Sequence, residues 1–217
     1  MHHMASLALA QQIENCRLCP RLVAYRENPP HKRPEPYWSK PVAGFGDPKA
    51  RLLIMGLAPG AHGSNRTGRP FTGDTSGNFL YPALYRAGMA NQSGSSVRDD
   101  GLELKGVYIS AVVRCAPPQN RPRPEEIASC ARWTVQETAE LGDLKAVLLL
   151  GKIAHDTWLR TWAEKPAQKP FRHGAVYPGE PILIDSYHVS RQNTQTGRLT
   201  TAMFDGILQQ AKQLARI

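Results

Sequence analysis

The residue types best suited to chemistry are concentrated between Gly56 and Gly77, a segment with six glycines in 22 residues. Glycines let a backbone approach a ligand closely and adopt φ values that other residues avoid. The same segment carries one aromatic ring, one carboxylate and one imidazole, in Phe71, Asp74 and His62. No Gly-Lys-Ser/Thr follows the glycines, so the segment is not a Walker phosphate loop. Two interpretations stay open: Asp74 and Phe71 face a ligand, or Asp74 caps a helix that begins near Gly77 while Phe71 fills the core.

A second polar segment runs from Ser186 to Gly197 and is crowded with amide and hydroxyl side chains. Within it, His188 follows closely on an expected buried strand, where a side chain can face a polar ligand. A lone histidine is more often structural, so residue type alone leaves that role open for His188.

Four cysteines form the third chemical signal: Cys16, Cys19, Cys115 and Cys130. The first two are separated by two residues, so both thiolates can face one point, whereas fourteen residues separate the last two. A structural zinc site usually supplies two tight pairs, and four thiolates also suffice for a [4Fe–4S] cluster. Four reduced cysteines without metal are a further alternative, and disulfides are rare in the cytosol. The spacing leaves zinc and iron–sulfur undecided.

These residues need a scaffold, and the hydrophobic pattern predicts one. Short apolar stretches typical of buried parallel strands lie at 51–56, 107–113, 145–150 and 181–184. Helical patterns lie at 5–15, 77–88, 124–140, 152–163 and 199–216, and Pro124 followed by two glutamates is a favourable helix start. Alternating strands and helices predict an α/β fold, with three α/β/α layers around a central, mainly parallel four-stranded sheet.

The distinctive segments follow the expected strands, at 56–60, 114–123 and 186–197. Ligands of such sheets bind in the loops beyond the carboxyl ends of the strands. Residues 26–49, rich in Pro, Gly and charge, are interpreted as an ordered loop that wraps the core together with the N-terminal cysteine pair. No internal repeat is visible, so we expect one domain over 1–217. Residues 1–4 resemble an expression remnant and are left aside.

Charge favours a polyanionic partner. Lys and Arg number 27 against 18 Asp and Glu, a formal charge of +9, and cations that neutralise phosphates release counterions. The cations are spread through loops, which suits a folded groove better than a flexible arm. No apolar run approaches the length of a membrane span and no leader is recognisable, so we expect a cytoplasmic protein.

Taken together, the motifs resemble those of the family-5 (type B) uracil-DNA glycosylases over nearly the whole chain. The resemblance is carried by Cys16-Arg-Leu-Cys19-Pro-Arg-Leu, the Gly56 to Gly77 segment, Arg114-Cys-Ala-Pro-Pro-Gln-Asn120 and Tyr187-His-Val-Ser-Arg-Gln-Asn-Thr-Gln-Thr-Gly197. It implies a three-layer α/β/α fold and a [4Fe–4S] cluster on all four cysteines. It also implies a prokaryotic, nucleoid-associated monomer that removes uracil from double- and single-stranded DNA.

The resemblance further implies roles for individual residues. Phe71 stacks on the flipped base, and His188 donates a hydrogen bond to the charge that develops on it. Asp74 orients or deprotonates the attacking water, and Asn120 helps hold the water or the base. The other expected substrate contacts are Gly56, Ala58, Gly60, Ala111, Ser190, Arg191 and Asn193.

Two departures from the wider superfamily refine this expectation. Leu57 and Ala58 follow the first glycine, where many members place a catalytic Asp, Glu or Asn, so Asp74 has to supply the carboxylate. Ala111 stands where family-4 relatives carry an asparagine that reads uracil. Loss of that polar contact should widen the substrate range to bases such as hypoxanthine or xanthine. None of the motifs supplies a lysine nucleophile, so the expected product is an abasic site.

Other readings of the sequence remain. A nucleoside hydrolase using the same loops would act on free nucleosides and would not need the positive charge. An iron–sulfur DNA-binding module without enzymatic activity would be insensitive to Asp74→Ala. A variant that traps the sugar covalently would need a histidine in an extra basic insertion after Asp74, and no such insertion is present.

Overall fold

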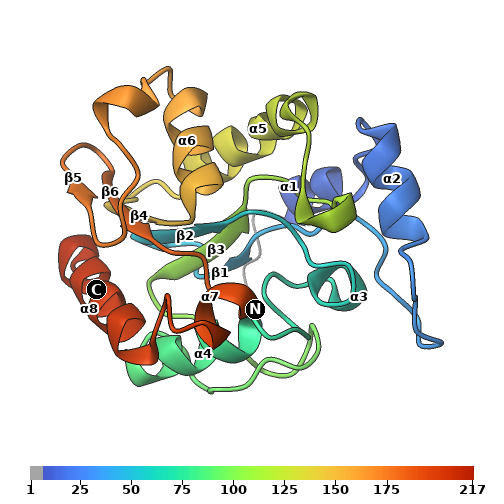
Figure 1. The fold of residues 1–217 in the computed structure, drawn as a ribbon, viewed down its shortest axis with the longest axis horizontal. Helices are drawn as coiled ribbons and strands as arrows, with labels where there is room; N and C mark the ends of the chain where they lie inside the picture. Colours follow the sequence, from blue (N-terminus) through green and yellow to red (C-terminus); the bar gives the residue numbers. More distant parts are fainter. Residues whose placement is uncertain (1–6) are drawn as a thin grey trace.

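The computed structural model describes residues 7–217 and is built around a six-stranded sheet with the order β1-β3-β2-β4-β6-β5 (Figure 1). Its four central strands are parallel: β2 (Leu52–Gly56), β3 (Val107–Ala111), β4 (Ala146–Leu150) and β6 (Ile182–Ser186). Two antiparallel strands, β1 (Phe45–Gly46) and β5 (Val176–Tyr177), close the edges. The predicted α/β class is confirmed, but four strands was too few, because a two-residue strand is too short to show an alternating pattern.

Register brings the ends of the central strands to one edge of the sheet. Gly56 pairs with Ala111, and Leu150 pairs with Ser186. The segments that follow β2, β3 and β6 therefore leave the sheet on the same side, where parallel sheets bind ligands.

Helices cover both faces of the sheet, as Figure 1 shows. On one face lie α1 (Leu7–Glu14), α5 (Pro124–Glu140) and α6 (Lys152–Thr161), and on the other lie α4 (Gly77–Arg86) and α8 (Thr201–Ala215). The faces follow from the pleat of β2, because Leu52 and Ile54 join one core cluster while Leu53 and Met55 join the other. The predicted three layers are confirmed.

The longer helices begin close to where their sequence patterns predict. Helix α5 begins at Pro124, and the Arg123 N–H donates to Glu126 Oε2 at 2.7 Å. In α8 the Thr200 side chain accepts a hydrogen bond from the Met203 N–H. The buried face of α8 consists of Phe204, Ile207, Leu208, Ala211 and Ala215, whereas Met203 is 37% exposed.

Several short elements were not predicted. They are α2 (Pro20–Glu27), α3 (Ser64–Thr67), α7 (Arg191–Gln195) and the 3₁₀ turns Pro118–Asn120 and Pro166–Gln168. Apart from α2, each is at most five residues long, less than two helical turns, so hydrophobic periodicity cannot reveal them. No helix within residues 7–217 is both long and apolar enough to cross a membrane. The N-terminal remnant lies outside the described residues.

Candidate active site

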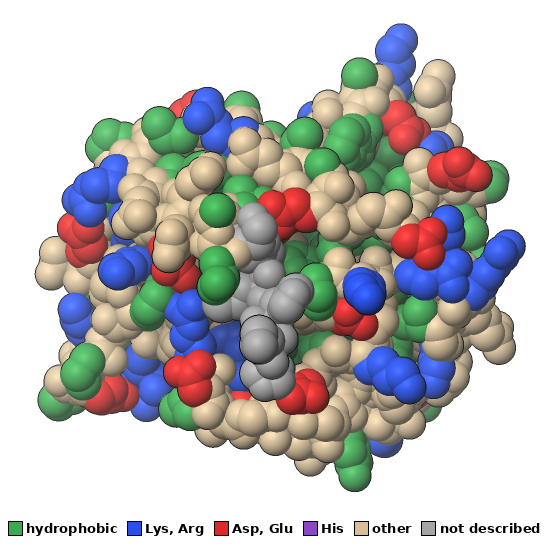
Figure 2. Space-filling model, turned by 180° about the vertical axis from the view of Figure 1, so that it is seen from behind, with side chains coloured by type: hydrophobic (Ala, Val, Ile, Leu, Met, Phe, Trp, Pro, Cys, Tyr) green, Lys and Arg blue, Asp and Glu red, His purple; other side chains and the backbone are tan. Residues whose placement is uncertain are grey.

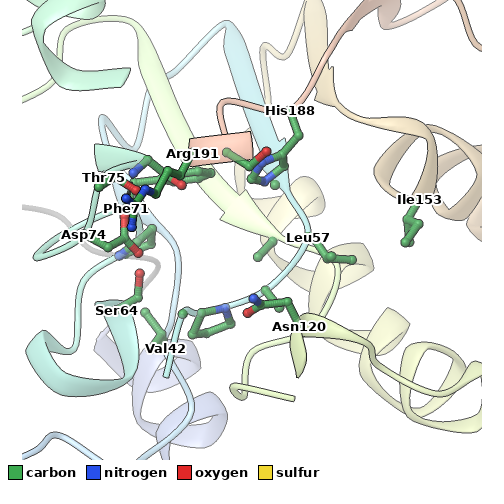
Figure 3. Close-up of a pocket in the computed structure, with 18 of the residues that line it drawn as sticks. Val42, Leu57, Ser64, Phe71, Asp74, Thr75, Asn120, Ile153, His188 and Arg191 are labelled. Carbon is green, nitrogen blue, oxygen red and sulfur yellow. Dashed lines mark hydrogen bonds between the residues drawn. The ribbon is translucent and has the colours of Figure 1, made fainter. Parts of the chain in front are cut away.

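A cleft of about 660 Å³ opens at the edge where β2, β3 and β6 end. Figure 3 shows side chains from the segments after these strands projecting into it, among them Phe71, Asp74, Asn120 and His188. The remaining predicted site residues that line it are Gly56, Ala58, Gly60, Ala111, Ser190 and Arg191. Residues that are distant in the sequence thus meet around one cavity.

Phe71 forms one wall and is held in an unusual backbone conformation, with φ of 51°. A Cβ on Gly56 would lie 2.6 Å from Phe71 Cζ, so only glycine at the end of β2 leaves room for this ring. The ring also packs against the core, at 6.2 Å from the His188 ring centroid. Phe71 is therefore both a packing residue and a cleft residue, and the two sequence interpretations are compatible.

A buried ion pair fixes the backbone on both sides of Phe71. Arg69 is 2% exposed and binds Asp100 through two hydrogen bonds of 2.8 and 2.7 Å. Its Nε donates to Thr72 Oγ1 at 3.0 Å. The Arg69 guanidinium holds the pKa of Asp100 well below its usual range against the opposing effect of burial, so the pair stays charged. This anchoring explains how a phenylalanine persists at a positive φ.

The two carboxylate oxygens of Asp74 have different surroundings. Its Oδ1 accepts hydrogen bonds from the N–H groups of Ser76 at 3.0 Å and Gly77 at 3.1 Å, at the start of α4. Its Oδ2 lies toward Gly60 and Gly63, and among the described residues no donor is hydrogen-bonded to it. Burial raises the pKa of Asp74 above its ordinary value, although the two backbone donors oppose the shift. One oxygen orients the group, and the other is left for a ligand or water.

His188 faces the cleft as a neutral imidazole. Burial lowers its pKa to about 4, because the charged form loses hydration without gaining a partner. Within the described part of the chain, the hydrogen bond recorded at His188 is made by its carbonyl, which accepts from Asn193 Nδ2 at 2.8 Å. The ring can therefore donate one N–H to a bound molecule.

Asn120 and the α7 segment complete the cleft. Asn120 ends a 3₁₀ turn, is exposed, and has φ of 55°, a region that asparagine tolerates. Ser190 caps α7 by accepting from the Asn193 N–H at 3.5 Å. Asn193, predicted to touch the substrate, is not among the residues that line the cleft; its amide holds the His188 backbone.

Basic side chains outnumber acidic ones both in the cleft lining and in the whole sequence. Figure 2 shows one face on which lysine and arginine side chains alternate with acidic ones. Among the described residues that line the cleft, Arg121 and Arg191 are the cations and Asp74 is the acid. The two arginines therefore favour an anionic ligand in the cleft, beside the carboxylate of Asp74.

The four cysteines meet in a second, much smaller cavity of about 20 Å³. Cys16, Cys19, Cys115 and Cys130 all line it, and none of the four forms a disulfide. Burial raises the pKa of Cys115 to about 11 and that of Cys130 to about 12. Within residues 7–217, no group of three or more His, Cys, Asp or Glu side chains has the arrangement of a metal-ion site.

Hydrogen-bond donors to cysteine sulfur atoms lie beside this cavity. Arg26 Nη1 donates to Cys115 Sγ at 3.0 Å and to the Cys16 carbonyl at 3.1 Å. The backbone N–H of Arg114 donates to Cys130 Sγ at 3.3 Å. Such donors and a nearby guanidinium suit thiolates, so the residues present fit a sulfur-ligated group.

The Uracil DNA glycosylase superfamily is the family whose model matches the chain, over residues 43–212. The chain belongs to the uracil-DNA glycosylase superfamily. A type-5 uracil-DNA glycosylase of Thermus thermophilus is 56% identical over 214 residues, covering 96% of this chain and 97% of the relative. Those of Mycobacterium tuberculosis and Pyrobaculum aerophilum are 46% and 43% identical, over 94% and 92% of this chain and 80% and 89% of theirs. The resemblance to this branch is confirmed, and the chain is a DNA glycosylase, a hydrolase of N-glycosidic bonds.

The glycosylase cleft also contains residues that the sequence did not single out. Among them are Val42, Gln119, Ile153 and Gln192. Gln119 precedes Asn120 in a recognised motif and has φ of 55°, so the motif could have drawn attention to it. Val42 and Ile153 are isolated apolar residues whose type carries no signal, although Ile153 is 46% exposed at the start of α6.

Proposed function

We propose that this glycosylase flips uracil out of DNA and hydrolyses its N-glycosidic bond, leaving an abasic site. The observation that carries the proposal is the convergence of Phe71, Asp74, Asn120 and His188 on one cleft in a member of this superfamily. A base inside a duplex is out of reach of such a cleft, so the nucleotide must first rotate out of the stack, at a cost of a few kcal/mol.

The base is held and activated by two rings. Phe71 offers a fixed aromatic face, and stacking on such a face contributes about 1–3 kcal/mol per base. As the C–N bond stretches, negative charge develops on the base, and the neutral His188 ring donates an N–H to it. A preorganised donor of this kind contributes about 10²–10³ in rate.

Asp74 positions and activates the attacking water molecule. Its Oδ1 is fixed by the start of α4, which leaves Oδ2 to accept a proton from water attacking the sugar carbon. The carboxylate also stabilises the positive charge that develops on the sugar. Asn120, exposed on the cleft wall, supplies an amide to hold the water or the base. No lysine lines the described cleft, which supports hydrolysis without an imine intermediate.

We also propose a [4Fe–4S] cluster on Cys16, Cys19, Cys115 and Cys130. Support comes from their common cavity and from the donors that Arg26 and Arg114 direct at sulfur. When bound, the cluster supplies iron–sulfur bonds that tie the N-terminal segment to the β3–α5 region. Hydrolysis needs no electron, so this role is structural.

We further propose that the enzyme removes other deaminated bases besides uracil. Ala111 lines the cleft at the end of β3 and presents a methyl group where a polar side chain would read the base edge. A site without that group rejects analogues less strongly. Hypoxanthine and xanthine are therefore proposed as additional substrates, in double- and single-stranded DNA.

The domain number, the oligomeric state and the location of the enzyme are also proposed. Both hydrophobic clusters pack on one continuous sheet, which supports a single domain, and we propose that it acts as a monomer. Relatives from bacteria and an archaeon support a prokaryotic enzyme acting on chromosomal DNA in the cytoplasm.

The test uses an end-labelled duplex with one uracil opposite guanine, treated with alkali after incubation. Wild type should give strand cleavage only after alkali, and Asp74→Asn should reduce it strongly. Asp99→Asn is the matched control, because Asp99 is exposed and does not line the cleft. Full activity of Asp74→Asn would refute the role of Asp74, and absence of base release by wild-type protein with an intact cluster would refute the function.

A further inference from the structure

The cleft continues beyond Asp74 into a second, more open hollow of about 550 Å³. The two hollows share Gly60, Asp74, Asn120 and Arg191 among their lining residues. They therefore form one groove, with the carboxylate at the junction. A strand with one nucleotide flipped into the first part has to continue on either side of that nucleotide.

The larger side chains found only in the second hollow carry polar groups, whereas Ala61, Gly63 and Gly73 contribute small residues. The larger ones are Tyr25, Arg33, His62 and Asn78. Among the described residues that line the second hollow, Arg33 and the shared Arg191 are the cations and Asp74 is the carboxylate. One further acid is close, because Glu35 Oε1 lies 3.8 Å from Arg33 Nη1. Both partners of that pair are exposed, and such solvated pairs contribute little, so the guanidinium can exchange it for another anion.

The segment that carries Arg33 is hydrogen-bonded to the Gly56–Gly77 segment, which also carries Asp74. Tyr37 Oη is hydrogen-bonded to His62 Nδ1 at 2.9 Å, and the two rings meet edge to face with centroids 6.1 Å apart. The Arg33 N–H donates to the same Tyr37 oxygen at 3.3 Å. Backbone N–H groups of Trp38 and Ser39 donate to carbonyls of α3 at 2.9 and 3.1 Å. These bonds make the segment a wall of the groove.

We propose that this second hollow binds the phosphodiester next to the flipped nucleotide on one side, with Arg33 as the phosphate contact. The inference builds on the proposed function and adds a place for the neighbouring strand. An arginine presents several N–H donors in a plane that matches phosphate oxygens. Tyr37 and His62 are positioning residues, because they hold the loop that presents Arg33.

Binding measurements separate this proposal from the catalytic one. The probe is a fluorescent duplex with a tetrahydrofuran abasic site, a non-cleavable product analogue, titrated at several salt concentrations. Arg33→Ala should reduce the slope of log K against log salt by about 0.9, the value of one duplex phosphate contact. Arg132→Ala is the charge-matched control, because Arg132 is exposed on α5 and lines neither hollow. Equal slopes for the two variants would overturn the proposal.

Truncated probes then locate the contact. Single-stranded versions are shortened to one nucleotide on the 5′ or on the 3′ side of the abasic site. Wild type should lose affinity on truncation of one side, and Arg33→Ala should lose clearly less on that same side. Tyr37→Phe, which removes the bond to His62 without changing charge, should show the same pattern more weakly. If Arg33→Ala keeps the full truncation loss on both sides, the phosphate site is elsewhere. Because the probe is never cleaved, failure of uracil release leaves this result interpretable.

Discussion

Asp74 Oδ2 lies so close to Gly60 that a Cβ on that glycine would be 2.9 Å from it. Gly60 does not have a positive φ, so alanine there meets the carboxylate rather than backbone strain. Close packing thus fixes the oxygen that is left for water, while the N–H groups of Ser76 and Gly77 hold the other.

We therefore predict that Gly60→Ala lowers the single-turnover rate of uracil release by roughly 10- to 100-fold, since misplacing a reacting group by about 1 Å has effects of this size. Gly142→Ala is the control, because nothing lies within 4 Å of a Cβ at that position. Rapid-quench kinetics at saturating DNA measure the effect. An unchanged rate in Gly60→Ala would show that the position of Oδ2 is not critical.

Asp74 should also lower stability at neutral pH. Burial raises its folded-state pKa above the unfolded value, so the ionised form is disfavoured by folding and stability falls as pH rises through that range. Asp74→Asn keeps an oxygen for Ser76 and Gly77 but carries no charge. We predict a higher Tm than wild type at neutral pH and a difference that shrinks as the pH falls below the folded-state pKa of Asp74. Thermal melts across this range test it, and a lower Tm at neutral pH would contradict it.

His188 should remain neutral far below the usual range of histidine. Burial lowers its pKa to about 4, so an NMR titration of the ring should show protonation only near that pH. His188→Ala should lower the rate by about 10²–10³ by removing a preorganised donor. A ring that protonates near pH 6.5 would mean that His188 is more hydrated than this cleft indicates.

The fold was largely predictable because its signals are local and repeated. The central strands are continuous apolar runs, and α5 begins with Pro124 and two glutamates. The edge strands and α7 were missed because two to five residues show no periodicity. Where motifs supplied unusual residue types, as at Asp74 and His188, the sequence pointed to residues that line the cleft, and their roles stay predictions.

Other parts of the site depend on tertiary contacts alone. The buried pair of Arg69 and Asp100 joins segments 31 residues apart, and no local pattern links them. The same holds for Val42, which reaches the cleft because its N–H bonds to the Arg114 carbonyl at 2.7 Å. For Asn193, the motif marked the residue as part of the site but could not show where its side chain points. The side-chain amide donates to the His188 carbonyl and does not line the cleft.

The pair of Arg69 and Asp100 should be a major source of stability. Asp100→Asn leaves the guanidinium of Arg69, itself 2% exposed, without its charged partner. Breaking a buried pair from one side costs about 3–5 kcal/mol, and we predict a loss of this size in the free energy of unfolding. Urea denaturation measures it, with Asp99→Asn, next in the chain and exposed, as the control. Equal losses in the two variants would assign the effect to the loop rather than to the pair.

Ala111 allows a test of base selectivity. Because it lines the cleft at the end of β3 without a hydrogen-bonding group, Ala111→Asn places an amide beside the flipped base. We predict that the ratio of kcat/KM for uracil over hypoxanthine rises by about 10-fold or more, since a polar group left unpaired by the wrong base penalises it. Competition between the two duplexes in one reaction measures the ratio directly. Ser93→Asn, at an exposed position outside the cleft and outside the cysteine cavity, controls for the added amide. If the ratio stays constant while both rates fall, the amide only obstructs the cleft, and selectivity is determined by other residues.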